Sequence, residues 1–485
     1  MRPDEEVALT PPQRWRAFAV CMVVTVTTVF DLTKVNVALP SIQDALGASS
    51  TELQLIVSGY VLTFGLALVP AGRIGDQRSR RLLFVIGLTI FATMSLACAL
   101  APTPDMLFAA RLAQGIGAGI QMPQVLGLVQ TLFQGDERAR AFGIFGVTVG
   151  MTMAVGPTLG GLAIAIGGPT DGWRWIFWMN LPLALLALAL ARWALPPPPP
   201  ASGRTLELDP VGLVLFTVSV LALMAPFLFT TGSPHDDPRR WWILALFAAL
   251  AGAFTVWERH YEASGRRPLV PPGLFRVPSY RNGIVLASAY FAANPVILLM
   301  STLYLQHGIG LAPVYAGMVS ISFAVMSAVA AWIGGRVIAR IGRALVVSGL
   351  VTVLAGVALL VLATLTTPTL TPWAMAAAMA VGGIGGGLVM TPNQTLTLAE
   401  VPVGQAGLAG SVGQLGQRVG GAVGAAIGLS LFYSSIYRET GATDTVDVSV
   451  YRHAYGFGML SVAAFLAIAL TVGIVDVSSR RRRVS

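Results

Sequence analysis

Long apolar stretches separated by short polar loops run along the whole chain. Each stretch of about 20 residues is long enough to cross roughly 30 Å of hydrocarbon as a helix. Fourteen such segments lie approximately at 17–39, 53–72, 82–101, 106–129, 141–166, 173–193, 210–230, 241–258, 282–305, 314–335, 344–366, 373–396, 408–432 and 454–477. The pattern predicts an all-α polytopic membrane protein.

The composition supports this interpretation. Of the 485 residues, 55% are hydrophobic and only 11% are charged, whereas ordinary globular proteins carry about 25% charged residues. This excludes a soluble cytosolic enzyme. The two cysteines, Cys21 and Cys98, lie in apolar runs and cannot build a disulfide framework or a metal cluster. We expect no metal and no cofactor.

The net charge of +9 comes from arginines between the apolar segments. Basic residues resist translocation and collect on the cytoplasmic side. Placing the N-terminus inside puts most of them there, including the loops 73–81, 259–281 and 336–343. The charge therefore indicates topology and no nucleic-acid partner. We expect a multi-pass protein of the plasma membrane with both termini in the cytoplasm.

Two parts of the chain repeat each other. GRIGDQRSR at 72–80 returns as GRVIARIGR at 335–343, and GIGAG at 115–119 returns as GIGGG at 383–387. Paired repeats in a polytopic protein are typical of transporters whose halves rock around a midplane site. The predicted domains are an N-terminal six-helix bundle (1–195), a proline-rich linker with two inserted spans (196–279) and a C-terminal six-helix bundle with a basic tail (280–485).

Charged residues inside the predicted spans indicate a structural or functional role, because inserting each one into the membrane costs about 2.5–3.5 kcal/mol. Asp31 and Lys34 are three positions apart and share a helix face. At a rise of about 1.5 Å per residue, Asp31, Lys34 and Arg111 lie about 13, 9 and 8 Å below the outer ends of their spans. We predict that the three side chains form one cluster.

Two interpretations of this cluster remain open. It can be a structural salt bridge that only lets the first span carry charge. We favour a proton-coupling site, because burial favours a protonated Asp31 and the two cations favour its carboxylate, so substrate or cavity opening can shift the balance. Lys34 is the only lysine in the chain, and burial can deprotonate a lysine but not an arginine.

Two further features indicate moving parts. Asp76 lies in a cytoplasmic loop with Arg73 and Arg80, where a carboxylate at a helix end can form a latch. Gly156, Pro157 and Gly160 predict a pliable helix at a bundle interface; tight packing without motion is the alternative for any one glycine stretch, but it explains this combination less well. A substrate cavity is predicted between spans 1, 4, 9 and 12, lined by Asn36, Gln114, Tyr290, Phe291, Asn294, Met375, Met379 and Asn393.

Taken together, these motifs resemble the major facilitator superfamily, specifically its fourteen-span drug:H⁺ antiporter branch (EmrB/QacA-like multidrug efflux transporters). DLTKVNVALP at 31–40 is similar to the first-span motif, RLAQG at 111–115 to the fourth-span arginine motif, and residues 146–161 to the antiporter signature. Loop 72–81 and WRWIFWMNLP at 173–182 match too. Lys34 stands where the family usually has an aliphatic residue, and Ser79 where it usually has glycine.

The resemblance implies the major facilitator fold and a coupling role for Asp31. We therefore expect a proton-coupled antiporter that exports amphipathic small molecules, such as drugs or antibiotics, by alternating access. Its partners would be a small-molecule substrate, protons and the bilayer, and we expect a monomer driven by the proton gradient. Alternatives are an exporter or flippase of a lipid or lipid-like metabolite and a transport-dead membrane sensor. An enzyme is not expected, since catalytic motifs such as His-Glu-x-x-His are missing from the sequence.

Overall fold

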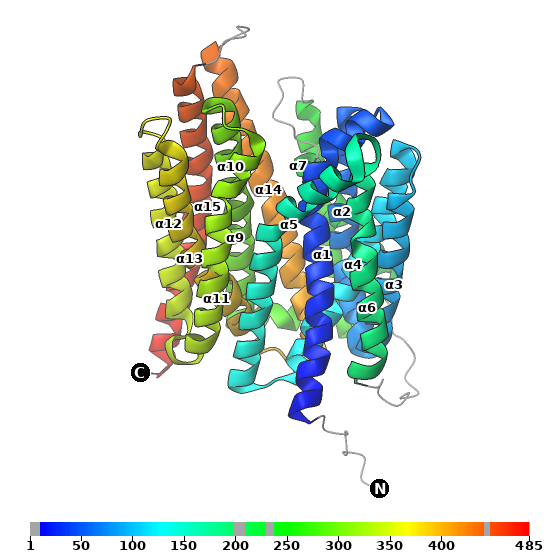
Figure 1. Ribbon diagram of the computed structural model, residues 1–485. Coiled ribbons are helices and arrows are strands. Elements are labelled where there is room, and N and C mark those ends of the chain that lie inside the picture. Colours follow the sequence, from blue (N-terminus) through cyan, green and yellow to red (C-terminus); the bar gives the residue numbers. More distant parts are fainter. Residues whose placement is uncertain (1–9, 197–208, 229–236, 441–446, 485) are drawn as a thin grey trace. The chain divides into compact units, whose positions relative to one another are not determined.

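A computed structural model describes residues 10–196, 209–228, 237–440 and 447–484 (Figure 1). Every regular element in these residues is a helix, which confirms the all-α class. The proline-rich linker predicted from 196 lies outside the described residues beyond Pro196.

The helices follow the predicted spans closely. The elements are α1 (Pro11–Leu46), α2 (Ser50–Gln77), α3 (Arg80–Ala99), α4 (Pro104–Leu132), α5 (Gly135–Trp178), α6 (Asn180–Ala194), α7 (Pro210–Leu228), η1 (Pro238–Trp242), α8 (Ile243–Ala263), η2 (Pro272–Arg276), α9 (Pro278–Leu303), η3 (Tyr304–Gly308), α10 (Pro313–Val319), α11 (Ile321–Ile341), α12 (Arg343–Ala363), α13 (Thr371–Leu398), η4 (Val403–Gln405), α14 (Ala406–Thr440) and α15 (Val448–Val484). Gly168, at φ 85°, interrupts α5, so its first part is the fifth span and its last turns begin the sixth.

Thirteen helical segments within the described ranges are long and apolar enough to cross a membrane. The predicted fourth span, α4, is not among them, because it carries Asp105, Arg111 and several glutamines. It is nevertheless 29 residues long, and it packs against both α2 and α3. Many large apolar side chains on the other helices point outward, including Trp193, Leu185 and Leu362. Such exposure is suited to lipid.

Contacts divide the chain into two units. Unit 1 comprises Met1–Ala141, Thr158–Leu206 and Pro402–Ser411, and unit 2 comprises Phe142–Pro157, Glu207–Val401 and Val412–Ser485. The helix pair α7 and α8 is therefore grouped with unit 2. The domain boundaries drawn from the sequence stay a prediction.

Unit 1 is built around the glycines of α4. Gly115 and Gly119 face the backbone of α2, and Gly117 faces α3. A Cβ atom on Gly119 would lie 2.5 Å from the carbonyl oxygen of Phe64, and one on Gly117 would lie 2.7 Å from the amide nitrogen of Phe91. Glycine is required at these positions because the helix backbones touch.

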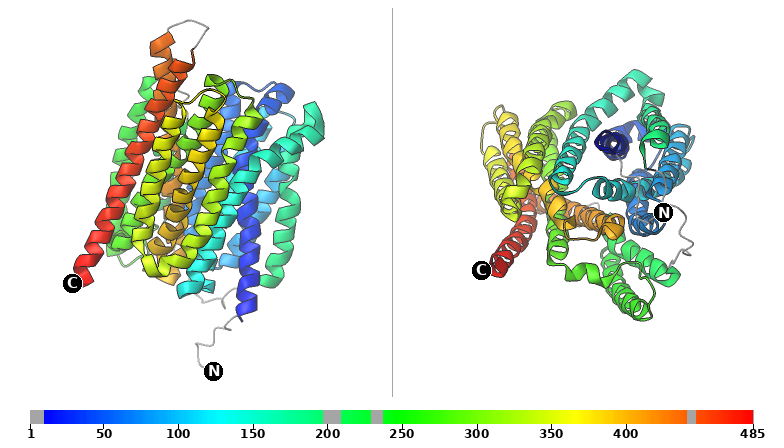
Figure 2. Two further views of the ribbon diagram at one scale, coloured as in Figure 1. Left: turned by 60° about the vertical axis from the view of Figure 1, so that its left-hand side comes forward. Right: turned by 90° about the horizontal axis from the view of Figure 1, so that it is seen from below.

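Unit 2 repeats this arrangement in α13. Gly383 and Gly387 face the backbone of α11, and Gly385 faces α12, where a Cβ atom would lie 2.5 Å from the carbonyl oxygen of Gly349. The red helix α15 packs along α9 and α12 (Figure 2). The sequence repeat therefore corresponds to a repeat of helix packing.

Candidate functional site

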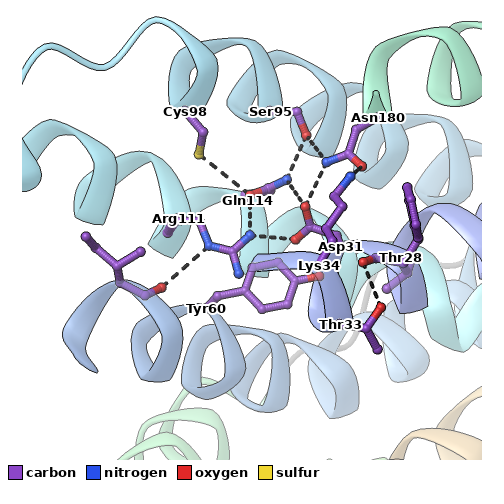
Figure 3. A network of polar contacts seen from close by, with 12 residues as sticks. Thr28, Asp31, Thr33, Lys34, Tyr60, Ser95, Cys98, Arg111, Gln114 and Asn180 are labelled. Carbon is purple, nitrogen blue, oxygen red and sulfur yellow. Dashed lines mark hydrogen bonds and ion pairs between the residues drawn. The ribbon is translucent and has the colours of Figure 1, made fainter. Parts of the chain in front are cut away.

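A buried polar network lies inside unit 1, where α1 meets α3, α4 and α6 (Figure 3). Asp31 and Lys34 come from α1, Ser95 from α3, Arg111 and Gln114 from α4, and Asn180 from the start of α6. All six side chains are at most 1% exposed. The predicted cluster of Asp31, Lys34 and Arg111 thus exists, within a larger set of neutral partners.

Asp31 is the centre of the network. Its Oδ2 accepts from Arg111 Nη1 at 2.5 Å, and its Oδ1 accepts from Asn180 Nδ2 at 2.7 Å and from Gln114 Nε2 at 3.3 Å. The carboxylate is therefore matched by one full positive charge and two amide donors. Such charge-assisted hydrogen bonds are about twice as strong as neutral ones.

Arg111 is held from several sides. Besides Asp31, its Nη1 donates to Gln114 Oε1 at 2.7 Å, and its Nε reaches the carbonyl oxygen of Ile56 at 3.5 Å. The guanidinium carbon lies 4.0 Å from the centre of the Tyr60 ring. These contacts tie α4 to both α1 and α2 at one point.

Lys34 is bound differently. Its Nζ donates to Asn180 Oδ1, and it lies 4.5 Å from the centre of the Phe30 ring. Among the described residues no carboxylate lies within ion-pair distance of this amine. On its other side α5 packs closely, since a Cβ atom on Gly160 would lie 2.9 Å from Lys34 Cβ.

Asn180 and Ser95 were not predicted from the sequence. Ser95 Oγ accepts from Gln114 Nε2 at 2.7 Å and from Asn180 Nδ2 at 3.0 Å. Because both Asn180 amide protons point at Ser95 and Asp31, its carbonyl oxygen must face Lys34. The sequence clue was a lone asparagine in the apolar stretch 173–182.

A second polar group involves Asp76, in the last turn of α2. Its carboxylate accepts from Arg80 Nη2 at 2.8 Å and from the backbone amides of Gly407 at 3.1 Å and Leu408 at 2.9 Å. Arg80 also donates to the carbonyl oxygens of Gly127 and Val403. Asp76 therefore binds the N-terminal amides of α14, as a carboxylate near a helix N-terminus should.

The other predicted switch residues are also placed. Arg73 is buried in α2, Gly156 is buried in α5, and Pro157 is exposed there. Ser79 caps α3, with its Oγ accepting from Leu82 N at 3.2 Å, so this departure from the family pattern has a structural role. A switching function for these residues stays a prediction.

The predicted cavity residues are spread over both units. Asn36 is exposed on α1, and Gln114 belongs to the buried network. In unit 2, Tyr290 donates to Asn294 at 3.3 Å and meets Phe291 edge to face, while Met375 and Met379 are fully buried in the hydrophobic core. Asn393 binds Arg343 and the carbonyl oxygen of Gly283. A substrate cavity lined by these residues stays a prediction.

Unit 2 contains a buried ion pair that the sequence did not predict. Arg343 Nε donates to Asp476 Oδ2 at 2.6 Å, and Asp476 Oδ1 accepts from Asn282 Nδ2 at 2.9 Å. Arg343 also donates to Asn393 and to the carbonyl oxygen of Ser279. In the sequence repeat Arg343 corresponds to Arg80, but the position equivalent to Asp76 is alanine.

Comparison with known proteins agrees with the fold. A family model described as Major Facilitator Superfamily matches residues 21–425. The chain is 33% identical over 460 residues to the probable actinorhodin transporter of Streptomyces coelicolor, covering 93% of this chain and 78% of that protein. It is 33% identical over 472 residues to puromycin resistance protein pur8 of Streptomyces alboniger, covering 95% and 92%.

A solved structure with a similar fold is that of the human organic anion transporter MFSD10. The two chains superpose with a TM-score of 0.64 at 16% identity, over 94% of this chain and 100% of that one. At this identity the likeness concerns the fold alone.

Proposed function

The chain belongs to the Major Facilitator Superfamily of membrane transporters, and from this premise we propose that it is a proton-coupled antiporter that exports amphipathic small molecules. Its function is transport and not enzymatic catalysis. Two relatives that align over nearly the whole chain are named as an actinorhodin transporter and a puromycin resistance protein. Their names support antibiotics and similar compounds as the substrate class.

The buried network around Asp31 is the observation that carries the proposal. The side chains of an aspartate, a lysine and an arginine are all withdrawn from solvent inside one helical bundle. Burying ions costs several kcal/mol each, and replacing a buried ion pair by apolar residues is often neutral or stabilising. Stability alone therefore does not explain why the chain retains three ionisable side chains here, whereas a charge that is exchanged during each transport cycle does.

The geometry also supports coupling between charge and helix position. Asp31 and Lys34 connect α1 to α4 through Arg111 and to α6 through Asn180. A change of one unit charge in this network alters which helices are held together. We expect Asp76 to act on the same transition by binding α14 in one state and releasing it in the other.

The test is Asp31→Asn, with Asp44→Asn as the matched control, because Asp44 is an exposed carboxylate on the same helix. Everted membrane vesicles would be energised and challenged with ethidium, chloramphenicol and cholate as cationic, neutral and anionic probes. We expect at least one probe to alkalinise the vesicle lumen with wild type and Asp44→Asn, and none to do so with Asp31→Asn at equal expression. Full alkalinisation with Asp31→Asn would show that Asp31 is not the coupling carboxylate.

A further inference from the structure

We propose that the exchanged proton is carried on Nζ of Lys34, while Asp31 remains ionised beside Arg111 throughout the cycle. This inference rests on the proposed function and assigns the proton within the same site. It reverses the simpler expectation that the carboxyl group itself takes up and releases the proton.

The first argument is the charge balance of the network. Asp31 and Arg111 neutralise each other at 2.5 Å. A Lys34 ammonium would add one uncompensated positive charge to a site in which all three side chains are at most 1% exposed. An isolated buried ion is so costly that the group usually becomes neutral instead. A neutral Lys34 amine leaves the closed site without net charge.

The second argument is the hydrogen bonding of Lys34. An ammonium has three donors and needs three acceptors. Within the described residues Nζ meets one acceptor, Asn180 Oδ1, and the face of the Phe30 ring. A cation–π contact contributes about 0.5–2 kcal/mol, whereas burying an ion costs several kcal/mol. The arrangement therefore fits the neutral amine, which satisfies Asn180 with one N–H.

The third argument excludes Asp31 as the carrier. Its two oxygens accept from Arg111, Asn180 and Gln114, and an added proton would remove the negative charge that these donors face. Arginine cannot lose its own charge in a protein. Removing the partner of a buried ion costs about 3–5 kcal/mol, and protonating Asp31 would do this to Arg111.

The other groups around Lys34 do not compete for the proton. The titratable and charged neighbours are Asp31 on α1, Tyr60 on α2, Cys98 on α3 and Arg111 on α4. A phenol and a thiol are ordinarily neutral at pH 7. The helices α5 and α6 contribute Gly160 and the neutral amide of Asn180.

Proton uptake at Lys34 would change the network. The neutral amine accepts a proton from a hydronium ion, so that an N–H bond forms, an O–H bond breaks and a water molecule is released. The ammonium is then drawn from Asn180 towards Asp31, three residues away on the same helix face. There it competes with Arg111, which loosens the connection of α1 to α4 and α6. Release of the proton restores the arrangement in Figure 3.

The single lysine of this chain allows a direct test. Full-length protein grown with ¹³Cε-labelled lysine has one side-chain signal, whose shift distinguishes ammonium from amine. In substrate-free protein at pH 8.5 we expect the amine, whereas free lysine is an ammonium at this pH. An ammonium signal at pH 8.5 would overturn the proposal, and this measurement needs no variant.

A transport test uses proteoliposomes with Lys34→Met and Lys34→Gln, both permanently neutral. In both variants we expect accumulation of labelled probe driven by a pH gradient to fall to the level seen without a gradient. Proton-driven accumulation equal to wild type in either variant would refute the role of Lys34. If wild type itself moves no protons with any probe, the proposed function fails, whatever the lysine signal shows.

Discussion

The buried ion pair of unit 2 gives a prediction about stability. Arg343 and Asp476 are 2.6 Å apart, and each side chain is 2% exposed. Asp476→Asn keeps the shape of the side chain but removes the carboxylate charge that Arg343 pairs with. Breaking a buried pair in this way costs about 3–5 kcal/mol. At about 1.4 kcal/mol per factor of ten, this lowers the ratio of folded to unfolded protein by a factor of roughly 10² to 10³ or more.

The measurement is the free energy of unfolding in detergent micelles, followed by tryptophan fluorescence. Glu137→Gln is the matched control, because Glu137 pairs with Arg14 at 3.1 Å but the side chains are 46% and 28% exposed. An exposed pair contributes only about 0–1 kcal/mol. Replacing both buried partners, with Arg343→Met and Asp476→Leu, should recover much of the loss. Equal losses for Asp476→Asn and Glu137→Gln would refute the reasoning.

Two further predictions concern helix contacts. Asp76→Ala removes the acceptor for the amides of Gly407 and Leu408. We expect the free energy of unfolding to fall by about 0.5–2 kcal/mol and the rate of probe efflux to change. An unchanged efflux rate would argue against a switching role. Gly117→Ala places a Cβ atom 2.7 Å from Phe91 N and should lower the free energy of unfolding by about 1–3 kcal/mol. Gly413→Ala, where nothing lies within 4 Å, should have no such effect, and equal behaviour of the two alanine variants would contradict the packing argument.

Much of the fold follows from sequence patterns whose violation would cost a large amount of free energy in a bilayer. Apolar length predicted the helices, because the bilayer leaves few alternatives. The glycines of α4 and α13 were recognised as a repeat in the sequence, and the structure places them at backbone contacts. Asp31, Lys34 and Arg111 were identified because charge in a span is rare. Helix α4 is the exception to the rule of apolar length, because it is too polar to count as a membrane span by composition. Its polar residues are tolerated because neighbouring helices cover it.

The residues that were not predicted have weaker signals in the sequence. Asn180 and Ser95 are neutral, so placing them in a span costs less free energy than placing a charge there. Their presence therefore does not by itself indicate a functional site. Arg343 and Asp476 lie near the ends of predicted spans, where charge is an ordinary sign of topology. Besides Arg80, Asp76 binds backbone amides of α14, which no side-chain pattern reveals. These contacts depend on which helix ends meet, and only the folded structure defines that.

The measurement that tests the central claim most directly is probe accumulation in proteoliposomes under an imposed pH gradient. Wild-type protein should accumulate at least one of the three probes against its own gradient, and a protonophore should abolish the accumulation. Asp31→Asn should accumulate none, while Asp44→Asn should match wild type. Accumulation that is indifferent to the pH gradient, or that persists in Asp31→Asn, would contradict a proton-coupled exporter built around this network.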